Sequence, residues 1–382
     1  MTQINEAQLI QWRHHIHAHP ELGFQEHNTA QYILKELSGI EGITLTQPTP
    51  TSVVATLVGT AGPGKTIALR ADIDALPVQE ANDVPFCSQN SGVGHMCGHD
   101  THAAMLMAAI AALAPERHTL HGTVKFLFQH AEELPPGGAI DLVKAGVLDD
   151  VDHCIGLHIM NGPVGKVKIL TDEVVTSSCD NCHITIHGKG SHSSRPHHGV
   201  DPILVGAEII LALHTIVSRN IDPSHFAAVS PNVFVGGTVS NVIPQTAELE
   251  VDIRAKNPDD RSLLMARVEE LVYGIAKNHH AEATLTWQPG AKSVVQDLAL
   301  VNEIKALAEA TLGAENVLTT TAMSGSEDFS EFSEVVPSCM YFNVLGGESP
   351  YENHHPQFLP KDEALITGTT MEVAIVKHFL KG

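Results

Sequence analysis

The chain has 382 residues, and its 22 Lys and Arg against 44 Asp and Glu give a formal net charge of −22. A chain this acidic is repelled by phosphate and by anionic lipid, and its sequence has no local basic patch to offset the repulsion, so neither nucleic acid nor a membrane is expected as a partner. At 43% hydrophobic residues the chain can fill a core, and its length predicts two or three domains. We therefore expect a folded protein whose partners are small molecules or metal cations.

The sequence carries no sign of export or membrane insertion. The longest apolar run, Ala103 to Pro115, is shorter than the roughly 18 residues that a membrane span needs. The opening MTQINEAQ has neither the basic nor the apolar region of a secretory signal, so we expect a cytoplasmic protein. Six cysteines in so long a chain do not form a small disulfide framework, and we expect their thiols to be reduced, packed or metal-bound.

The first part of the chain alternates helical patterns with runs typical of strands. Helices are predicted at residues 6–18, 29–37, 101–113 and 140–145, and strands at residues 52–58, 65–70, 123–129 and 153–159. Asp100 is placed as the N-cap of the helix at 101–113, because its short carboxylate can accept hydrogen bonds from the first helical amides. Strands that alternate with helices are typical of a mostly parallel sheet covered by helices, so the predicted fold class is α/β.

A change of pattern marks a second domain. From about residue 178, strands are predicted at 183–187 and 246–254 and helices at 202–218 and 260–278. Two helices on an antiparallel sheet form an α+β module, and after about residue 292 the chain returns to helix and apolar strand, at 300–312, 339–344 and 363–379. We predict a larger α/β domain made of residues 1–177 and 289–382, interrupted by an inserted α+β lid or dimerisation domain at residues 178–288.

Side chains that bind metals recur at the ends of the predicted strands of the larger domain, where an open α/β sheet forms its ligand crevice. They are Cys97 and His99 before the helix at 101–113, Glu132 and Glu133 after the strand at 123–129, His158 at the end of the strand at 153–159, and His354 and His355 near the end of the chain. Thiolate, imidazole and carboxylate together suit a divalent transition metal ion, and four or five such groups can hold two ions. Of two adjacent carboxylates, one can bind metal while its neighbour takes a proton from water.

Other interpretations of these residues remain open at this point. A lone His158 at a strand end is more often a packed or capped histidine than a ligand, and the carboxylate pair alone is more often solvated. A cysteine hydrolase would use Cys97 as nucleophile with His99 or His102 as base, but a thiol nucleophile needs only one base and one orienting group, so the additional His and Glu argue against it. A metal-binding protein without activity is disfavoured by an intact Glu132.

A family resemblance rests on short strings that follow one another along nearly the whole chain. They are RHHIHAHPE (13–21), LRADIDALP (69–77), MCGHDTH (96–102), Glu132-Glu133, GLH (156–158), GKGSH (188–192), GGTVSNVIP (236–244), DIR (252–254), GSEDF (325–329) and HHPQF (354–358). With these strings the chain resembles the amidohydrolase branch of the co-catalytic metallopeptidases. That group contains hippurate hydrolases, N-acyl-amino-acid deacetylases and plant auxin-conjugate hydrolases.

The resemblance implies five metal ligands, with the thiolate of Cys97 bridging two ions. The implied ligands are Cys97, His99, Glu133, His158 and His354. His355 is the alternative to His354, and the spacing from Pro356 favours His354. In the wider clan an Asp bridges the ions and a His stands where this chain has Asp72, so the resemblance argues against a general dipeptidase or carboxypeptidase.

The resemblance also implies roles for four more side chains. Glu132 is the base that accepts a proton from the attacking water and later passes it to the leaving amine. His192 matches a histidine that donates to the developing oxyanion, commonly in the active site of the partner subunit; by itself it would be an exposed histidine on a loop rich in Gly and Ser. Asn241 and Arg254 match a pair that grips the substrate carboxylate, and a surface salt bridge is the alternative for Arg254.

The sequence thus predicts a metal-dependent amidohydrolase that acts on linear amides. The expected substrate is an N-acyl-amino acid, the expected cofactors are two divalent ions per subunit (Zn, Mn, Co or Ni), and the expected assembly is a homodimer formed through the inserted domain. Acetyl, benzoyl, indoleacetyl and acylated diamino-acid substrates all remain open, because pocket shape decides among them, and metal availability decides among the ions. Dipeptidase or carboxypeptidase cleavage on the same fold, and a Cys97 thiol hydrolase, are the alternatives.

Overall fold

The computed structural model describes residues 4–344 and 351–381. The chain divides into two compact units: a larger one made of Met1–Val175, Val295–Ala322 and Asp328–Gly382, and a smaller one made of Thr176–Val294 and Met323–Glu327. In sequence, the smaller unit is therefore inserted between parts of the larger one. Within the described ranges, no helix is both long and apolar enough to cross a bilayer.

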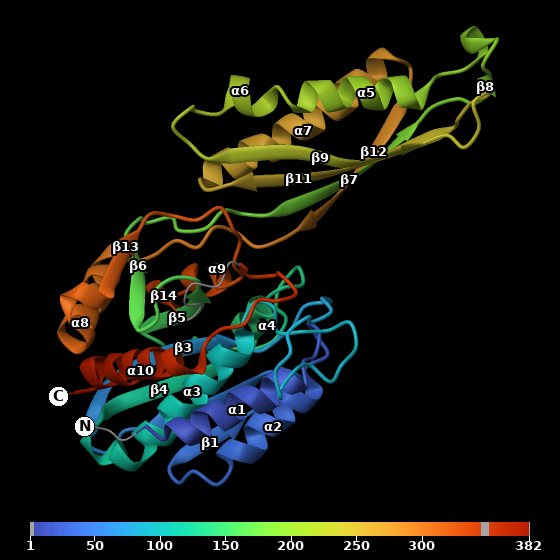
Figure 1. Ribbon diagram of the computed structural model, residues 1–382. Coiled ribbons are helices and arrows are strands. Elements are labelled where there is room, and N and C mark those ends of the chain that lie inside the picture. The colour runs from blue at the N-terminus through green and yellow to red at the C-terminus, as the bar shows by residue number, and fades with distance from the viewer. Residues whose placement is uncertain (1–3, 345–350, 382) are drawn as a thin grey trace. The chain divides into compact units, whose positions relative to one another are not determined.

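The larger unit is built on one eight-stranded sheet with the strand order β1-β2-β4-β3-β5-β14-β6-β13 (Figure 1). Its strands are β1 (Ile43–Thr46), β2 (Val53–Val58), β3 (Gly62–Asp72), β4 (His121–Gln129), β5 (His153–Met160), β6 (Lys166–Leu170), β13 (Val317–Thr320) and β14 (Ser338–Val344). The four central strands β4, β3, β5 and β14 run parallel, while β1 with β2, β2 with β4 and β6 with β14 are antiparallel. The predicted α/β class, with a mostly parallel sheet, is confirmed.

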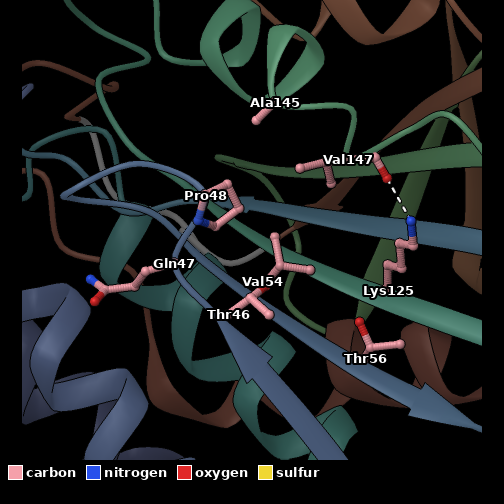
Figure 2. A pocket seen from close by; sticks show the side chains of 8 residues that line it. All are labelled: Thr46, Gln47, Pro48, Val54, Thr56, Lys125, Ala145 and Val147. Carbon is pink, nitrogen blue, oxygen red and sulfur yellow. Dashed lines mark hydrogen bonds between the residues drawn. The ribbon is translucent and has the colours of Figure 1, made fainter.

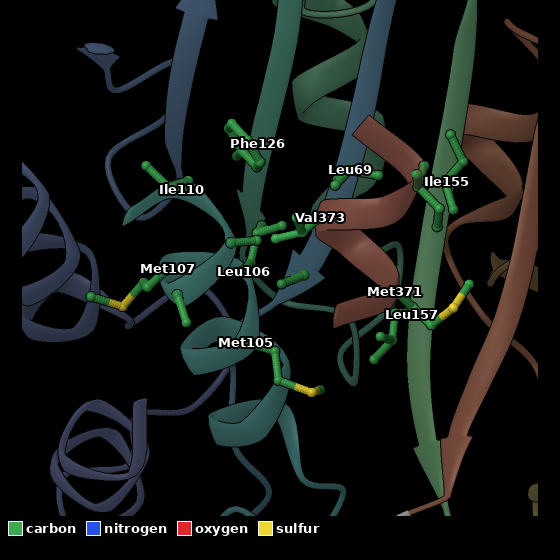
Figure 3. Packing of buried hydrophobic residues seen from close by; sticks show 14 of the residues in the cluster. Leu69, Met105, Leu106, Met107, Ile110, Phe126, Ile155, Leu157, Met371 and Val373 are labelled. Carbon is green, nitrogen blue, oxygen red and sulfur yellow. The ribbon is translucent and has the colours of Figure 1, made fainter. Parts of the chain in front are cut away.

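Helices pack on both faces of this sheet. They are α1 (Glu6–Ala18), α2 (His27–Leu37), α3 (His99–Leu113), α4 (Ala139–Lys144), α8 (Leu298–Leu312), α9 (Ser330–Ser333) and α10 (Leu365–Phe379), with short 3-10 helices η1 (Ala114–Thr119), η3 (Ala314–Asn316) and η4 (Asp362–Ala364). Ile155 and Leu157 of β5 belong to the core beneath α3 and α10, as Figure 3 shows. Gly156 between them points to the opposite face, where a Cβ would meet the ring of Phe329, one residue before α9.

The core of the larger unit forms where α3 and α10 meet the central strands (Figure 3). α3 consists mostly of Ala, Met and Leu and is buried on nearly every side, as expected of a helix that is apolar all round. Leu106 of α3 and Val373 of α10 pack with Phe126 of β4 in this cluster. This packing fixes the N-terminus of α3 at one edge of the sheet.

Asp100 does not cap α3, contrary to the prediction. The N-cap position is Gly98, and the helix begins at His99, so Asp100 lies in the first turn. Its carboxylate instead accepts hydrogen bonds from Arg13 Nε and His17 Nδ1, both at 2.9 Å, and both partners come from α1. A sequence pattern cannot show this role, because the partners are far away in the chain and all three side chains are buried.

Replacing Asp100 with Ala should destabilise the larger unit strongly. The substitution leaves the buried Arg13 guanidinium without its most enclosed partner, and breaking a buried pair in this way costs about 3–5 kcal/mol of unfolding free energy. Urea denaturation measures the change. As a control, Glu309→Ala removes the partly exposed i,i+4 partner of Lys305 and should cost no more than about 0.5 kcal/mol. Equal stability losses in the two variants would contradict the argument.

The smaller unit consists of one antiparallel sheet, β12-β7-β11-β9, with helices packed on it and a separate two-stranded ribbon of β8 and β10. Its elements are β7 (Asp180–His187), β8 (Ser191–His192), η2 (Pro196–His198), α5 (Pro202–Leu213), α6 (Ile216–Asn220), β9 (Ala227–Gly236), β10 (Val242–Ile243), β11 (Thr246–Ala255), α7 (Pro258–Asn278) and β12 (Glu282–Pro289). Cys182, Ile184 and Ile186 alternate along β7 into the core of this unit. The unit has an α+β architecture of its own.

The helix predicted at 202–218 is two helices in the structure. α5 ends at Leu213 and α6 begins at Ile216, because the amide and the hydroxyl of Thr215 both donate to the Ala212 carbonyl, at 2.9 Å and 2.7 Å. A side-chain hydroxyl that competes for a helix carbonyl in this way favours a turn over continued helix.

Candidate metal centre

The central parallel strands bring the predicted ligands to one edge of the sheet. β3 leads to Asp74, β4 leads to the Glu132-Glu133 turn, and β5 carries His158 near its end. The carboxyl ends of parallel neighbours open at the same edge, which is where an open α/β sheet binds its ligands. The N-terminus of α3 reaches this edge with Cys97 and His99.

Gly98 makes the turn between Cys97 and His99. Its φ of +87° lies in the left-handed region, and a Cβ there would come within 2.1 Å of Ile159 Cδ1. Only glycine satisfies both conditions without strain. The turn directs the Cys97 thiol and the His99 imidazole toward the same cluster of side chains.

The structure places all five predicted ligands close to one another. Ligand atoms of Cys97, His99 and Glu133 lie within 4.8 Å of one another. Cys97 Sγ lies 3.5 Å from His158 Nε2, and His354 Nε2 lies 3.1 Å from Glu133 Oε1. The neighbouring His355 stacks instead on Tyr351, with ring centroids 4.3 Å apart.

His354 reaches this cluster from a segment bound to the loop of Cys97. Its amide donates to the Met96 carbonyl at 2.6 Å, and the side-chain amide of Asn353 donates to the Cys97 carbonyl at 3.3 Å. His354 has a φ of +72°, an uncommon conformation for a residue with a Cβ. These contacts position the imidazole beside Glu133 although the two residues are far apart in sequence.

His99 is oriented by Asp74 so that one ring nitrogen remains available. Its Nδ1 lies 3.0 Å from Asp74 Oδ1, while the buried Nε2 has no hydrogen-bond partner among the described residues. A buried polar atom without a partner is costly, and a carboxylate that holds the other ring nitrogen is the usual support of a metal-binding histidine. The residues present therefore fit a bound metal ion.

A second group of possible ligands shares two histidines with the five predicted ones and consists of Asp72, His99, His102 and His158, of which all but His158 are buried. His102 Nε2 accepts a hydrogen bond from the Ile159 amide at 3.0 Å, so the proton of a neutral His102 is on Nδ1, which lies 2.5 Å from Asp72 Oδ1. Arg70 pairs with the other oxygen of Asp72 at 2.6 Å. Sequence reasoning did not assign these supporting roles, although all three residues lie in the strings that carry the family resemblance.

The pKa values within the cluster favour a deprotonated Cys97 thiolate beside protonated histidines. Burial and Glu133 raise the pKa of the Cys97 thiol, but His158 and His99 outweigh them and lower that pKa to about 6. Burial lowers the pKa of His158, and the neighbouring Cys97 more than offsets this, so the pKa rises to about 9. Hydrogen bonding to Cys97 and Glu133 raises the pKa of His354 to about 10. A divalent cation at this place would displace those protons, because its ligands must be deprotonated.

Glu132, the predicted base, is half-buried and directly precedes Glu133. It does not belong to the group of Cys97, His99 and Glu133; a carboxylate oxygen of Glu132 lies within 4.8 Å of one of Asp328. Glu132 lies on the same turn as the predicted ligand Glu133.

The smaller unit holds His192, Asn241 and Arg254, and it does not bring all three together. His192 pairs with Val242 across the β8–β10 ribbon, and the Asn241 carbonyl accepts the Ser193 amide, so His192 and Asn241 are neighbours. Arg254 lies near the other end of β11, where its guanidinium binds Asp252 at 2.9 Å and 3.3 Å. From Thr246, where β11 begins, to Arg254 is eight strand positions, or about 27 Å at 3.4 Å per residue.

Comparisons with known proteins agree with these features. Residues 68–378 match the description Peptidase family M20/M25/M40. The chain is 41% identical over 292 residues, 76% of this chain and 78% of the relative, to the N-acyl-L-amino acid amidohydrolase of Geobacillus stearothermophilus. It is 33% identical, over 98% of this chain and 96% of the relative, to thermostable carboxypeptidase 2 of Saccharolobus solfataricus.

A solved structure extends the similarity to the whole fold. The YXEP protein of Bacillus subtilis, described as a dinuclear metal binding peptidase from the M20 family, superposes with a TM-score of 0.83 at 32% identity, covering 98% of each chain. The family match covers most of the chain, and the relatives match at identities that unrelated proteins do not reach over such lengths. The chain therefore belongs to Peptidase family M20/M25/M40 and is a hydrolase that acts on amide bonds.

Proposed function

We propose that this protein hydrolyses N-acyl-amino acids to a carboxylate and a free amino acid, with two divalent metal ions per subunit. The observation that carries the proposal is the cluster of one thiol, three imidazoles and one carboxylate, supported behind by Asp74, Asp72 and His102. Cys97, His99, Glu133, His158 and His354 would hold the ions. The name of the Geobacillus relative supports the substrate class.

When bound, the ions would polarise the scissile carbonyl and make water more acidic at neutral pH. The protein's own side chains then move the protons. Glu132 accepts the proton of the attacking water and passes it to the leaving amine, and the turn that it shares with the ligand Glu133 keeps it next to the reacting groups.

His192 is the proposed donor to the developing oxyanion. Its Nδ1 accepts a hydrogen bond from the Ser194 amide at 3.1 Å, so a neutral imidazole carries its proton on Nε2. That tautomer presents an N–H donor on the exposed side of the ring, as stabilisation of a negative oxygen requires. Asn241, its neighbour across the ribbon, would bind the substrate beside it.

Within one chain, Arg254 lies too far from His192 and Asn241 for all three to contact the same substrate molecule. They could contact one substrate only if they came from two different subunits. Strand β11 alone separates Arg254 from the ribbon by about 27 Å, whereas a molecule of two amino-acid units spans about 7 Å. We therefore propose that Arg254 and the pair of His192 and Asn241 come from two different subunits, with His192 acting in the site of the partner subunit. In this arrangement the substrate carboxylate draws Arg254 away from Asp252.

The second copy has a suitable surface on the smaller unit. β9 is an edge strand of its sheet, and Val233, Phe234 and Val235 are exposed in succession along it, at 41%, 38% and 58%. Leu204 and Leu211 of α5 are also exposed. An open edge with successive apolar side chains is a template for pairing with another strand, so we propose a homodimer through this edge.

A hydrolysis screen tests the substrate class. After reconstitution with Zn, Mn, Co or Ni, the enzyme should release free amino acid from at least one member of a panel of N-acetyl, N-benzoyl and indoleacetyl amino acids, detected with an amine-reactive reagent. Peptides with a free amino terminus form the comparison set, because one relative is named a carboxypeptidase. Preference for these peptides over every N-acyl-amino acid would replace the proposal by peptidase activity.

Chelation separates the metal mechanism from a thiol mechanism. Prolonged treatment with a strong chelator should reduce activity at least about 100-fold, since the water and the carbonyl lose their activation, and added divalent metal should restore it. Metal content measured on the same samples provides the control. If activity survived metal removal and disappeared on thiol alkylation, Cys97 would be a nucleophile instead of a ligand.

A further inference from the structure

The turn that carries Glu132 is fixed at the amides on both sides of it. The Ala131 amide donates to Glu26 Oε1 at 2.7 Å, and the Glu133 amide donates to Asp74 Oδ2 at 2.9 Å. The Ala131 carbonyl accepts a third hydrogen bond, from the Gly138 amide at 3.0 Å. Glu132 thus lies between two backbone groups that are each anchored on a carboxylate.

Ala131 needs such an anchor because its backbone is strained. Its φ of +50° lies in the left-handed region, which costs a residue with a Cβ about 1 kcal/mol or more. A residue stays in this conformation only where its surroundings hold it there. Ala131 is fully buried, so its amide could not exchange Glu26 for water without the turn opening.

The Glu26 side chain binds this turn and does not cap the helix α2 that follows it. Glu26 occupies the N-cap position of α2 but makes no capping hydrogen bond with its side chain. The Glu21 carboxylate caps the helix instead, because it accepts hydrogen bonds from the backbone amides of Asn28 and Thr29 at 3.2 Å and 2.8 Å. The Glu26 side chain is therefore not required to begin α2, although it is entirely buried.

The loop before Glu26 packs on the same turn. A Cβ on Gly23 would lie 3.1 Å from Leu134 Cβ and 3.3 Å from Ala131 Cα. The ring of Phe24 meets that of His130 edge-on, with centroids 5.4 Å apart. Glu26 is thus the polar anchor of an otherwise apolar contact between two loops.

We propose that Glu26 is a positioning residue for catalysis: through the Ala131 amide it fixes the turn from which Glu132 approaches the reacting water. The inference rests on the proposed role of Glu132 as base. Asp74 holds the other side of the turn and also orients His99, so Asp74 serves the predicted metal ligands as well. Within residues 4–344 and 351–381, no hydrogen bond or ion pair joins the Glu26 side chain to any of the five predicted ligands.

Two substitutions at Glu26 separate positioning from folding. Glu26→Gln keeps an acceptor oxygen for the Ala131 amide, whereas Glu26→Met has similar bulk and no acceptor. We expect Glu26→Met to lower kcat about 10- to 100-fold with KM and metal content within about twofold of wild type, because small misplacements of a reacting group have effects of this size. Glu26→Gln should keep kcat within about threefold of wild type.

A second measurement does not depend on activity or on metal. In metal-free protein, hydrogen exchange followed by mass spectrometry should show faster exchange of the peptide that contains Ala131 in Glu26→Met than in wild type or Glu26→Gln. If Glu26→Met does not fold, the same comparison is made in an Ala131→Gly background, where glycine adopts the positive φ without strain.

A double variant shows whether Glu26 acts through Glu132. Glu26→Met combined with Glu132→Gln should be no slower than Glu132→Gln alone, since a base that is absent cannot be misplaced. Wild-type kcat in Glu26→Met, equal losses in the Met and Gln variants, or fully additive losses in the double variant would each overturn the proposal. Full turnover by Glu132→Gln alone would instead refute the proposed base, and the exchange data would still decide whether Glu26 holds the turn.

Discussion

Glu132→Gln should lower kcat by about 10²- to 10⁴-fold, the range that general acid–base catalysis contributes. The amide has nearly the same shape as the carboxylate but cannot accept the proton of the attacking water. The turn should remain intact, since the Ala131 and Glu133 amides hold it to Glu26 and Asp74. Steady-state hydrolysis of the best substrate from the N-acyl-amino-acid panel measures the loss.

Metal content decides how that loss is interpreted. Glu132 lies outside the group of Cys97, His99 and Glu133, so Glu132→Gln should bind metal to the wild-type stoichiometry. Glu133→Gln should instead lose metal together with activity. Glu41→Gln, in which an almost fully exposed carboxylate is replaced, controls for the change in net charge and should behave as wild type. Persistent turnover by fully metallated Glu132→Gln would assign the base to another residue.

Several of the longer elements could be predicted from the sequence. The helix expected at 6–18 is α1, and the strands expected at 123–129 and 153–159 lie within β4 and β5. Short elements with mixed patterns could not be predicted: β13 covers only Val317–Thr320 and contains two threonines, and β6 alternates lysine with apolar residues. Such segments become strands because neighbours in the sheet pair with them, and pairing is not written in the local sequence.

The donors of the candidate metal centre could be predicted because their chemistry is local. A Cys and a His two positions apart around a glycine, and paired carboxylates after a strand, are visible as residue types at strand ends. Their supports could not be predicted, because each depends on a contact between distant segments: His99 with Asp74, and His102 with Asp72. Asp100 illustrates the difficulty, since an acidic residue before a predicted helix favours a cap until the buried Arg13 is known to lie beside it.

The length of β11 between Asn241 and Arg254 argues against both residues binding one substrate from the same chain. The family resemblance implies that they grip one carboxylate together, but in this chain the ribbon strand β10 and most of β11 extend between them. A strand advances about 3.4 Å per residue, so two residues on one strand soon lie farther apart than a small substrate can span. This distance is why we propose that a second subunit supplies the other half of the site.

Mixing two inactive variants should therefore restore activity. In a dimer of one His192→Ala chain and one Glu132→Gln chain, one site has an intact Glu132 from the first chain and an intact His192 from the second, whereas the other site has both defects. Random exchange of equal amounts makes half of the dimers hybrid, so the mixture should regain about a quarter of wild-type activity. Each variant alone should stay near its own low background.

Subunit exchange has to be shown independently for this result to be decisive. Differently tagged chains, co-purified after mixing, report the hybrid fraction, and recovered activity should rise in proportion to it. A mixture of His192→Ala with a His192→Gln variant forms hybrids as well but contains no intact His192, so it should stay inactive. Proven exchange without recovery would place His192 in the site of its own chain, and the separation of Arg254 from the ribbon would then require that Arg254 does not bind the substrate. Recovery would establish that a single chain of this enzyme does not contain a complete active site.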